Sequence, residues 1–226
     1  MAYPVSYVAD YASPRNRLTA FFRLILAIPI LIWVALYGIV VELAVIAAWF
    51  VVVITAKFPE GLYRFIAGFV ELEVQATAYT VLLAEPYPPF MPGAKPDYPV
   101  QMQFDGPLPA YSRLKAFFRW LLAIPIVVVR YVAQLLLEIT AVAAWAVSVV
   151  LGRLPRGLFD PMVLANSYIA RSDAYLFLLT ETYPPFQDEQ TRLAGVEHSD
   201  RRLEEQTAPV GLEHGETRMG EFQNPQ

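Results

Sequence analysis

Two glutamates interrupt the most apolar parts of this 226-residue chain. Glu42 is the single charged residue between Leu24 and Ala56, and Glu138 lies in a second stretch of the same kind. An ionisable side chain in such a stretch is costly in lipid, so it is a candidate for handling an ion, a proton or a substrate. If the chain turns near Glu42, however, the carboxylate lies at a wet loop end and costs little.

The second stretch adds Arg130 and Gln134, which with Glu138 are spaced i, i+4 and i+8 on one face of a helix. This stripe could pair internally or line a small polar cavity. We expect Arg130 to point away from lipid, toward Gln134 and Glu138 or toward a neighbouring subunit. Glu42, Arg130, Gln134 and Glu138 are therefore the candidate functional polar residues.

The remaining residues point away from catalysis. The chain has no cysteine, and both of its histidines lie in the polar segment after residue 186. Thiolate metal sites and thiol or histidine catalysis in the apolar body are thereby excluded. No glycine-rich phosphate loop or paired-histidine motif is present. We therefore predict no catalytic residue, no metal and no cofactor, and a chain that is not an enzyme. Cations flank the apolar stretches instead of forming a patch interleaved with aromatic residues, so no nucleic-acid partner is predicted either.

An internal repeat organises these residues. Residues 15–90 align without gaps with residues 111–186 at an offset of 96, and "AFFR", "LAIPI", "AAW" and "YPPF" each occur in both copies. Such self-similarity means one structural unit used twice. Short alternating segments at 3–11 and 98–104 predict a strand before each copy, and the strands could pair. In the boxes "AAW", the small alanines beside Trp49 and Trp145 are expected to let helices pack closely.

The chain accordingly divides into five parts. Residues 1–14 form a strand and a helix entry, 15–90 the first repeat, 91–110 a linker with a strand, and 111–186 the second repeat. Residues 187–226 form a tail with nine acidic and four basic residues, which we expect to be disordered. Ser13-Pro14 and Pro109 are expected to begin the helices.

Each apolar stretch allows two interpretations. From Leu24 to Ala56 it has 33 residues, whereas about 20 cross a bilayer. It is either one long, tilted or kinked helix, or a hairpin of two short helices that turns near Gly38–Glu42. Cations bracket the stretch at both ends, which meets the positive-inside tendency at every crossing of a hairpin. We therefore favour the hairpin.

The last part of each copy predicts an amphipathic helix at the membrane interface or covering the hairpin. In 62–83, Arg64, Gly68, Glu71 and Gln75 share one stripe, and aromatic and aliphatic residues share the opposite one. A third span would bury carboxylates, so the interfacial position is favoured. The prolines of each "YPPF" then stop the helix. The expected anchors at the membrane interface are Arg23, Lys57, Tyr87, Phe90, Arg119, Arg153, Tyr183 and Phe186.

The combined pattern "AFFRW-LLAIP", "AAW", "P-x-GL" and "AY-x-x-LL-x-x-x-YPPF" resembles a family of uncharacterised bacterial, chiefly actinobacterial, membrane proteins that is classed as a domain of unknown function. The resemblance covers residues 15–90 and 111–186. It implies an integral inner-membrane protein and brings no established activity with it.

The sequence thus predicts an all-α membrane protein of two tandem parallel repeats, each a short transmembrane helical hairpin plus an amphipathic interfacial helix, with a short strand before each repeat. We expect a multi-pass protein of the bacterial plasma membrane with its N-terminus and tail in the cytoplasm. A scaffold or accessory subunit of a membrane complex is the favoured function, with the lipid bilayer and either a membrane protein or a second copy as partners. The alternative is a small transporter, channel or lipid-handling protein that uses Glu42, Arg130 and Glu138.

Overall fold

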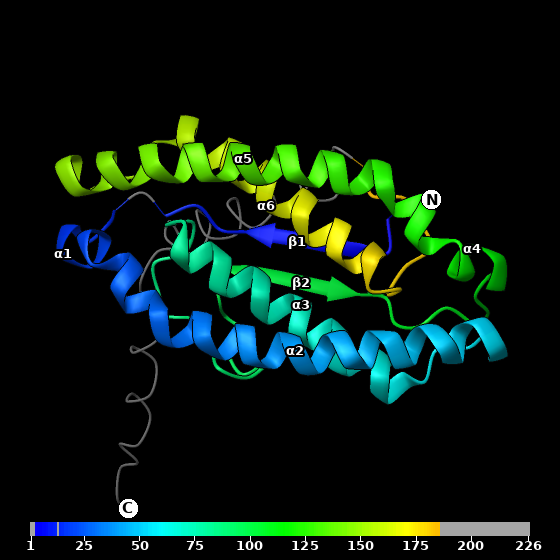
Figure 1. The fold of residues 1–226 in the computed structure, drawn as a ribbon. Coiled ribbons are helices and arrows are strands. Elements are labelled where there is room, and N and C mark those ends of the chain that lie inside the picture. The colour runs from blue at the N-terminus through cyan, green and yellow to red at the C-terminus, as the bar shows by residue number, and fades with distance from the viewer. Residues whose placement is uncertain (1–2, 13, 186–226) are drawn as a thin grey trace, which may run out of the picture.

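The computed structural model describes residues 3–12 and 14–185 as two equal sets of elements (Figure 1). Each set contains a short strand, a five-residue helix, a 33-residue helix and a 21-residue helix. The first set is β1 (Val5–Ala9), α1 (Arg17–Phe21), α2 (Arg23–Thr55) and α3 (Glu60–Thr80); the second is β2 (Val100–Phe104), α4 (Arg113–Phe117), α5 (Arg119–Leu151) and α6 (Arg156–Leu176).

The short helices begin at side-chain caps. The Asn16 carboxamide oxygen accepts hydrogen bonds from the backbone N–H groups of Leu18 and Thr19, and Ser112 Oγ accepts one from Lys115. Asparagine and serine favour this position because they satisfy N–H groups that have no partner within the helix. The predicted starts at Pro14 and Pro109 are therefore wrong, because the helices begin at Arg17 and Arg113; Ser13 lies outside the described residues.

Each apolar stretch is one continuous helix, so the predicted hairpin is wrong and the long-helix alternative is confirmed. α2 passes through Gly38–Glu42 without a break. A Cβ at Gly38 would lie 3.2 Å from the Phe69 ring, so this glycine allows close packing against α3 and does not mark a turn. The long helices end where Ala56 (φ 58°) and Gly152 (φ 67°) adopt the left-handed conformation.

The 21-residue helices lie in the centre of the molecule, where each covers the long helix of its own copy in place of the predicted hairpin. α3 packs along α2, α6 packs along α5, and the two also contact each other and the strands. Their polar residues are covered in part, since Gln75 and Arg171 are each 1% exposed, whereas the Arg64 side chain is 76% exposed. The polar stripe of α3 therefore meets the sheet at Gln75 and is open to solvent at Arg64.

The two strands pair with each other, as expected. β1 and β2 are antiparallel, and Tyr7 lies opposite Met102. The contacts on either side of this pair are equivalent: the Tyr3 hydroxyl bonds the Arg171 carbonyl oxygen at 3.4 Å, and the Tyr98 hydroxyl bonds that of Gln75 at 3.3 Å. The repeats are therefore related by an approximate two-fold axis through the sheet.

This symmetry makes the two long helices antiparallel to each other. The start of each copy bonds the end of the other copy's long helix, through Arg15 N to Gly152 O (3.0 Å) and Tyr111 N to Ala56 O (2.8 Å). The "AAW" box joins the copies too, because Trp49 Nε1 donates to the Ala116 carbonyl and its ring lies on Phe117. The even number of crossings per copy, from which the parallel arrangement was predicted, is absent, because each copy has a single long helix.

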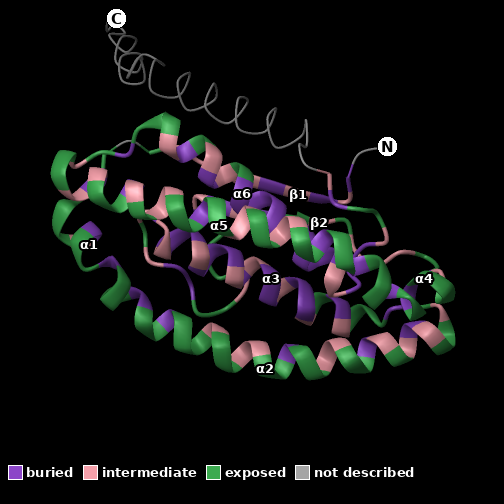
Figure 2. Ribbon diagram, turned by 45° about the horizontal axis from the view of Figure 1, so that its top comes forward, coloured by how far each residue is buried: buried purple, intermediate pink, exposed green. Residues whose placement is uncertain are grey.

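The elements form three layers, with the sheet on one side, α3 and α6 in the middle, and the long helices on the other side (Figures 1 and 2). Only 17% of the most apolar window of each long helix is buried. Fourteen exposed large apolar side chains lie on α2 and fifteen on α5. Within the described residues, α2 and α5 are thus two helices long and apolar enough to cross a membrane.

Candidate functional site

The four candidate polar residues do not form one group. Glu42 and Glu138 are exposed near the middle of their helices. Gln134 Nε2 donates to Glu138 Oε1 at 2.9 Å, which confirms internal pairing for this part of the stripe. Arg130 turns to a different partner, so the prediction that it faces Gln134 and Glu138 is wrong.

That partner is Asp173 on α6. Arg130 Nε and Nη2 donate to the two carboxylate oxygens of Asp173 at 2.7 and 3.1 Å. The Asp173 side chain is 6% exposed and that of Arg130 is 31% exposed. A two-point contact of this kind is stronger and more directional than a single hydrogen bond.

Glu73 of α3 completes a charge cluster where the two repeats meet. Burial, and next the negative charge of Asp173, raise the pKa of the Glu73 carboxyl to about 8, and Arg130 opposes the shift. Glu73 is therefore influenced by the charges of both members of the ion pair, and at this pKa it can gain or lose a proton near neutral pH. We call Glu73, Arg130 and Asp173 the central charge cluster.

Sequence reasoning missed Glu73 and Asp173, although a signal was available. The equivalent positions in the other repeat are Ile169 for Glu73, Thr77 for Asp173 and Val34 for Arg130. All three cluster residues thus carry a charge where the other copy is neutral. A comparison of the copies position by position would have selected them, together with Arg15, Glu71, Lys115 and Arg171, which meet the same criterion.

Two of the predicted interface anchors lie inside the protein. Arg23 is 1% exposed; it contacts Glu85 Oε2 at 2.7 Å and lies 4.2 Å from the centre of the Tyr79 ring. Arg119 is 4% exposed and donates to the Thr180 carbonyl at 2.9 Å, with its guanidinium 4.0 Å from the Tyr175 ring. In each repeat, this arginine ties the start of the long helix to the turn that follows the 21-residue helix.

The other predicted anchors have more varied surroundings. Lys57, Phe90, Arg153 and Tyr183 are exposed, and Tyr87 is half-buried against Tyr79. Their contact with headgroups stays a prediction. Phe186 lies outside the described residues.

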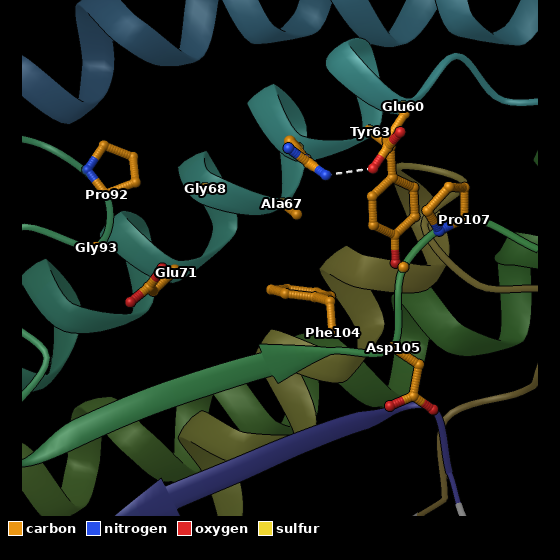
Figure 3. Close-up of a pocket in the computed structure, with 12 residues that line it drawn as sticks. Glu60, Tyr63, Ala67, Gly68, Glu71, Pro92, Gly93, Phe104, Asp105 and Pro107 are labelled. Atoms are coloured by element: carbon orange, nitrogen blue, oxygen red, sulfur yellow. Dashed lines mark hydrogen bonds and ion pairs between the residues drawn. The ribbon is translucent and has the colours of Figure 1, made fainter.

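A cleft of about 580 Å³ opens beside the sheet, between α3, the loop at Pro92 and Gly93, and the segment after β2 (Figure 3). Its lining includes the aromatic rings of Tyr63 and Phe104 and the carboxylates of Glu60, Glu71 and Asp105. Glu60 is paired with Arg64, also in the lining. Carboxylates beside aromatic rings suit a cationic group. No cluster of residues suited to a metal ion occurs in the described part of the chain.

The charged residues that α3 contributes to the cleft are specific to the first repeat. The positions of Glu60, Arg64 and Glu71 are occupied in the second repeat by Arg156, Asp160 and Ser167. None of the residues that line it was among the sequence candidates.

Comparison with protein families confirms the resemblance. The model of a family described as a domain of unknown function (DUF4389) matches the chain twice, at residues 17–92 and 113–187. These ranges follow the two structural repeats from the short helix to the turn after the 21-residue helix. No curated protein matches the chain, and no solved structure does.

Proposed function

We propose that this chain, which belongs to the DUF4389 family and contains two copies of its domain, is a membrane-embedded, non-catalytic scaffold or accessory subunit. The observation that carries this proposal is the exposure of α2 and α5, whose apolar side chains are covered along only one narrow stripe. An exposed Leu, Ile or Phe side chain forgoes about 1.5–3 kcal/mol of burial free energy. Apolar surfaces of such extent are rare on soluble monomers and are typical of membrane or protein contacts.

The arrangement of the charged residues supports a structural role. Arg23 and Arg119 bind carboxylate or carbonyl groups of the protein itself. Arg15 is also buried and donates to the carbonyl oxygens of Leu82 and Leu83. These three buried arginines, of which Arg23 and Arg119 occupy equivalent positions in the two copies, therefore hold parts of the fold together.

The cleft is the surface that we propose for a partner protein. It is concave, it lies away from the apolar helices, and it presents Glu71 and Asp105 beside Phe104 (Figure 3). A basic or aromatic segment of a membrane protein would suit this lining.

The proposal is tested by membrane fractionation followed by affinity recovery in mild detergent. We expect the chain to stay in the membrane pellet after alkaline carbonate washing and to bring a defined membrane protein with it. Recovery should weaken for Glu71→Lys and persist for Asp160→Lys, which reverses the charge of an exposed carboxylate on α6 outside the cleft. Release by carbonate would refute membrane embedding, and recovery without any partner would refute the scaffold role.

The central charge cluster favours a second candidate, a proton-coupled transporter. Burial and the charge of Asp173 raise the pKa of Glu73 to about 8, which would let this carboxyl exchange a proton near neutral pH beside the ion pair. Flux of protons into proteoliposomes that disappears in Glu73→Gln and persists in Glu42→Gln would support this candidate. No flux above that of empty liposomes would exclude it.

A further inference from the structure

The two ends of the molecule carry the same charge. Because the long helices are antiparallel, each end combines the start of one copy with the end of the other. Arg17, Arg153 and Arg156 are exposed at one end, and Lys57, Arg113 and Lys115 at the other. If the long helices crossed a bilayer, three of these cations would lie on each side, against the positive-inside tendency.

The sheet gives a second reason why the long helices do not cross. The strands run in roughly the same direction as α2 and α5, with α3 and α6 between them (Figure 1). A crossing would therefore carry the sheet into the hydrocarbon. A two-stranded sheet has two outer edges, and open edges are not tolerated there. Its outer face also carries Ser6, Gln101 and Gln103, none of which is buried.

The positions of Glu42 and Glu138 give a third reason. α2 covers residues 23–55 and α5 covers 119–151, so both carboxylates lie within a turn of the helix midpoints. A crossing would place both near the bilayer centre, at about 2.5–3.5 kcal/mol each on insertion scales. Each follows a buried residue, Val41 or Leu137, by one position. With 100° between residues, each carboxylate lies beside the protein-facing stripe and away from the centre of the exposed arc.

Length gives a fourth reason. A helix of 33 residues is about 50 Å long, whereas the hydrocarbon layer is about 30 Å thick. Two such helices could cross only with a large tilt. A helix that lies in the plane of the membrane has no such mismatch.

We propose that the protein enters the bilayer from the cytoplasmic side alone, with α2 and α5 lying in the plane of one leaflet. This inference rests on the membrane embedding proposed above and adds its geometry. The apolar faces of the long helices contact acyl chains, and the exposed cations at both ends contact the headgroups. The sheet, on the opposite side of the layered structure, faces the cytoplasm (Figure 2). The cleft opens beside the sheet and is reached from the same side.

Single cysteines test this geometry directly, because the chain has none of its own. Ala12→Cys marks one end of the molecule, Ala110→Cys the other end, and Gln103→Cys the sheet; all three residues are exposed. Ile39→Cys, on the exposed arc of α2 and 59% exposed, marks the proposed lipid face. Each variant is treated with a membrane-impermeant maleimide in right-side-out and in inside-out vesicles.

We expect the first three cysteines to react in inside-out vesicles only, and Ile39→Cys to react in neither preparation until detergent is added. Labelling of Ala12→Cys and Ala110→Cys from opposite sides would overturn the in-plane geometry and leave membrane embedding intact. Fast labelling of Ile39→Cys in both preparations would instead show that α2 is in water. The labelling pattern therefore distinguishes a failure of the in-plane geometry from a failure of the proposed membrane embedding.

Discussion

Arg130 on α5 holds both carboxylate oxygens of Asp173 on α6, whereas the first repeat has Val34 and Thr77 at the equivalent positions. One contact between a long helix and its neighbouring helix is thus ionic in one repeat and neutral in the other. Since the backbone has the same arrangement in both repeats, we infer that the pair Arg130 and Asp173 can be replaced as a unit by the neutral pair of valine and threonine.

We predict that Arg130→Val destabilises the protein and that adding Asp173→Thr restores most of the loss. Removing one member of a buried pair leaves an uncompensated charge and costs about 3–5 kcal/mol, with the lower end expected here because Arg130 is 31% exposed. The double variant recreates the neutral pair of the first repeat. Thermal unfolding in detergent micelles, followed by circular dichroism, measures the difference.

The stability of the single variant Asp173→Thr should lie between that of Arg130→Val and that of the double variant, because Arg130 then still has Glu73 as a neighbouring charge. Glu138→Gln serves as the matched control, since it alters an exposed carboxylate on the same helix. If the double variant is as unstable as Arg130→Val, the exchange of pairs between repeats is refuted.

The second prediction concerns pH. Burial raises the pKa of Glu73 from 4.5 to about 8, so the folded protein keeps a proton that the unfolded chain releases at lower pH. The stability that this proton contributes is fully present below about pH 4.5 and is lost as the pH rises to about 8, by at most about 1.4 kcal/mol per pH unit. Glu73→Gln cannot ionise, and we expect its melting temperature to equal that of the wild type near pH 4.5 and to exceed it near pH 8.5.

Melting curves at several pH values, for the wild type, Glu73→Gln and Glu42→Gln, measure this effect. Glu42 is exposed, and its replacement should leave the pH profile as in the wild type. Parallel profiles for the wild type and Glu73→Gln would show that Glu73 is ionised in the folded state throughout.

A third prediction uses the contact between Gly38 and Phe69. The second repeat has Gln134 and Ala165 at these positions, a larger residue on the long helix and a smaller one opposite. Gly38→Gln should be destabilising by about 1–3 kcal/mol, because a Cβ there already lies 3.2 Å from the Phe69 ring. The double variant Gly38→Gln/Phe69→Ala should lose clearly less than the sum of the two single changes. Additive losses in chemical denaturation would argue against direct packing between the two residues.

Much of the architecture could be predicted from the repeat. Fixed spacing and alternating segments indicated two equal units and a pair of strands, and both are present. The hairpin was predicted because cations at both ends of an apolar stretch were taken to require an even number of crossings. The order of charged residues along the chain does not state how deeply a helix lies in the bilayer. Cations at both ends of an apolar stretch fit a single helix in the plane of the membrane equally well.

The central charge cluster could not be found by a search within one helix. Glu73 and Asp173 belong to different repeats, and each stands on a helix with an ordinary mixture of polar and apolar residues. They come together because the two-fold axis brings α3 against α6. Arg130 was noticed because it lies in an apolar stretch and has no charged counterpart in the first copy. Its partner was expected on the same helix or on a neighbouring subunit, because the sequence gives no tertiary contact.

The last prediction distinguishes the buried Arg23 from its equivalent Arg119 by the groups that each contacts. The Glu85 carboxylate contacts Arg23 at 2.7 Å and Arg15 at 3.7 Å, and it also accepts hydrogen bonds from Asn16 N and Thr19 Oγ1. Glu181, its equivalent, accepts from Ser112 N, and the position of Arg15 is occupied by Tyr111. Within the described residues, Arg119 forms no ion pair and binds the Thr180 carbonyl instead.

Glutamine keeps the size of glutamate and an acceptor oxygen, so Glu85→Gln and Glu181→Gln remove mainly the charge. We expect Glu85→Gln to cost about 2–4 kcal/mol, because two buried guanidinium groups then lack their carboxylate. Glu181→Gln should cost about 1 kcal/mol or less, because Arg119 keeps its carbonyl partner and its contact with Tyr175. Thermal unfolding of both variants in the same detergent gives the comparison. Equal losses at the two sites would mean that Glu85 acts through its hydrogen bonds to Asn16 and Thr19, and that Arg15 and Arg23 are held by the carbonyl groups and the Tyr79 ring alone.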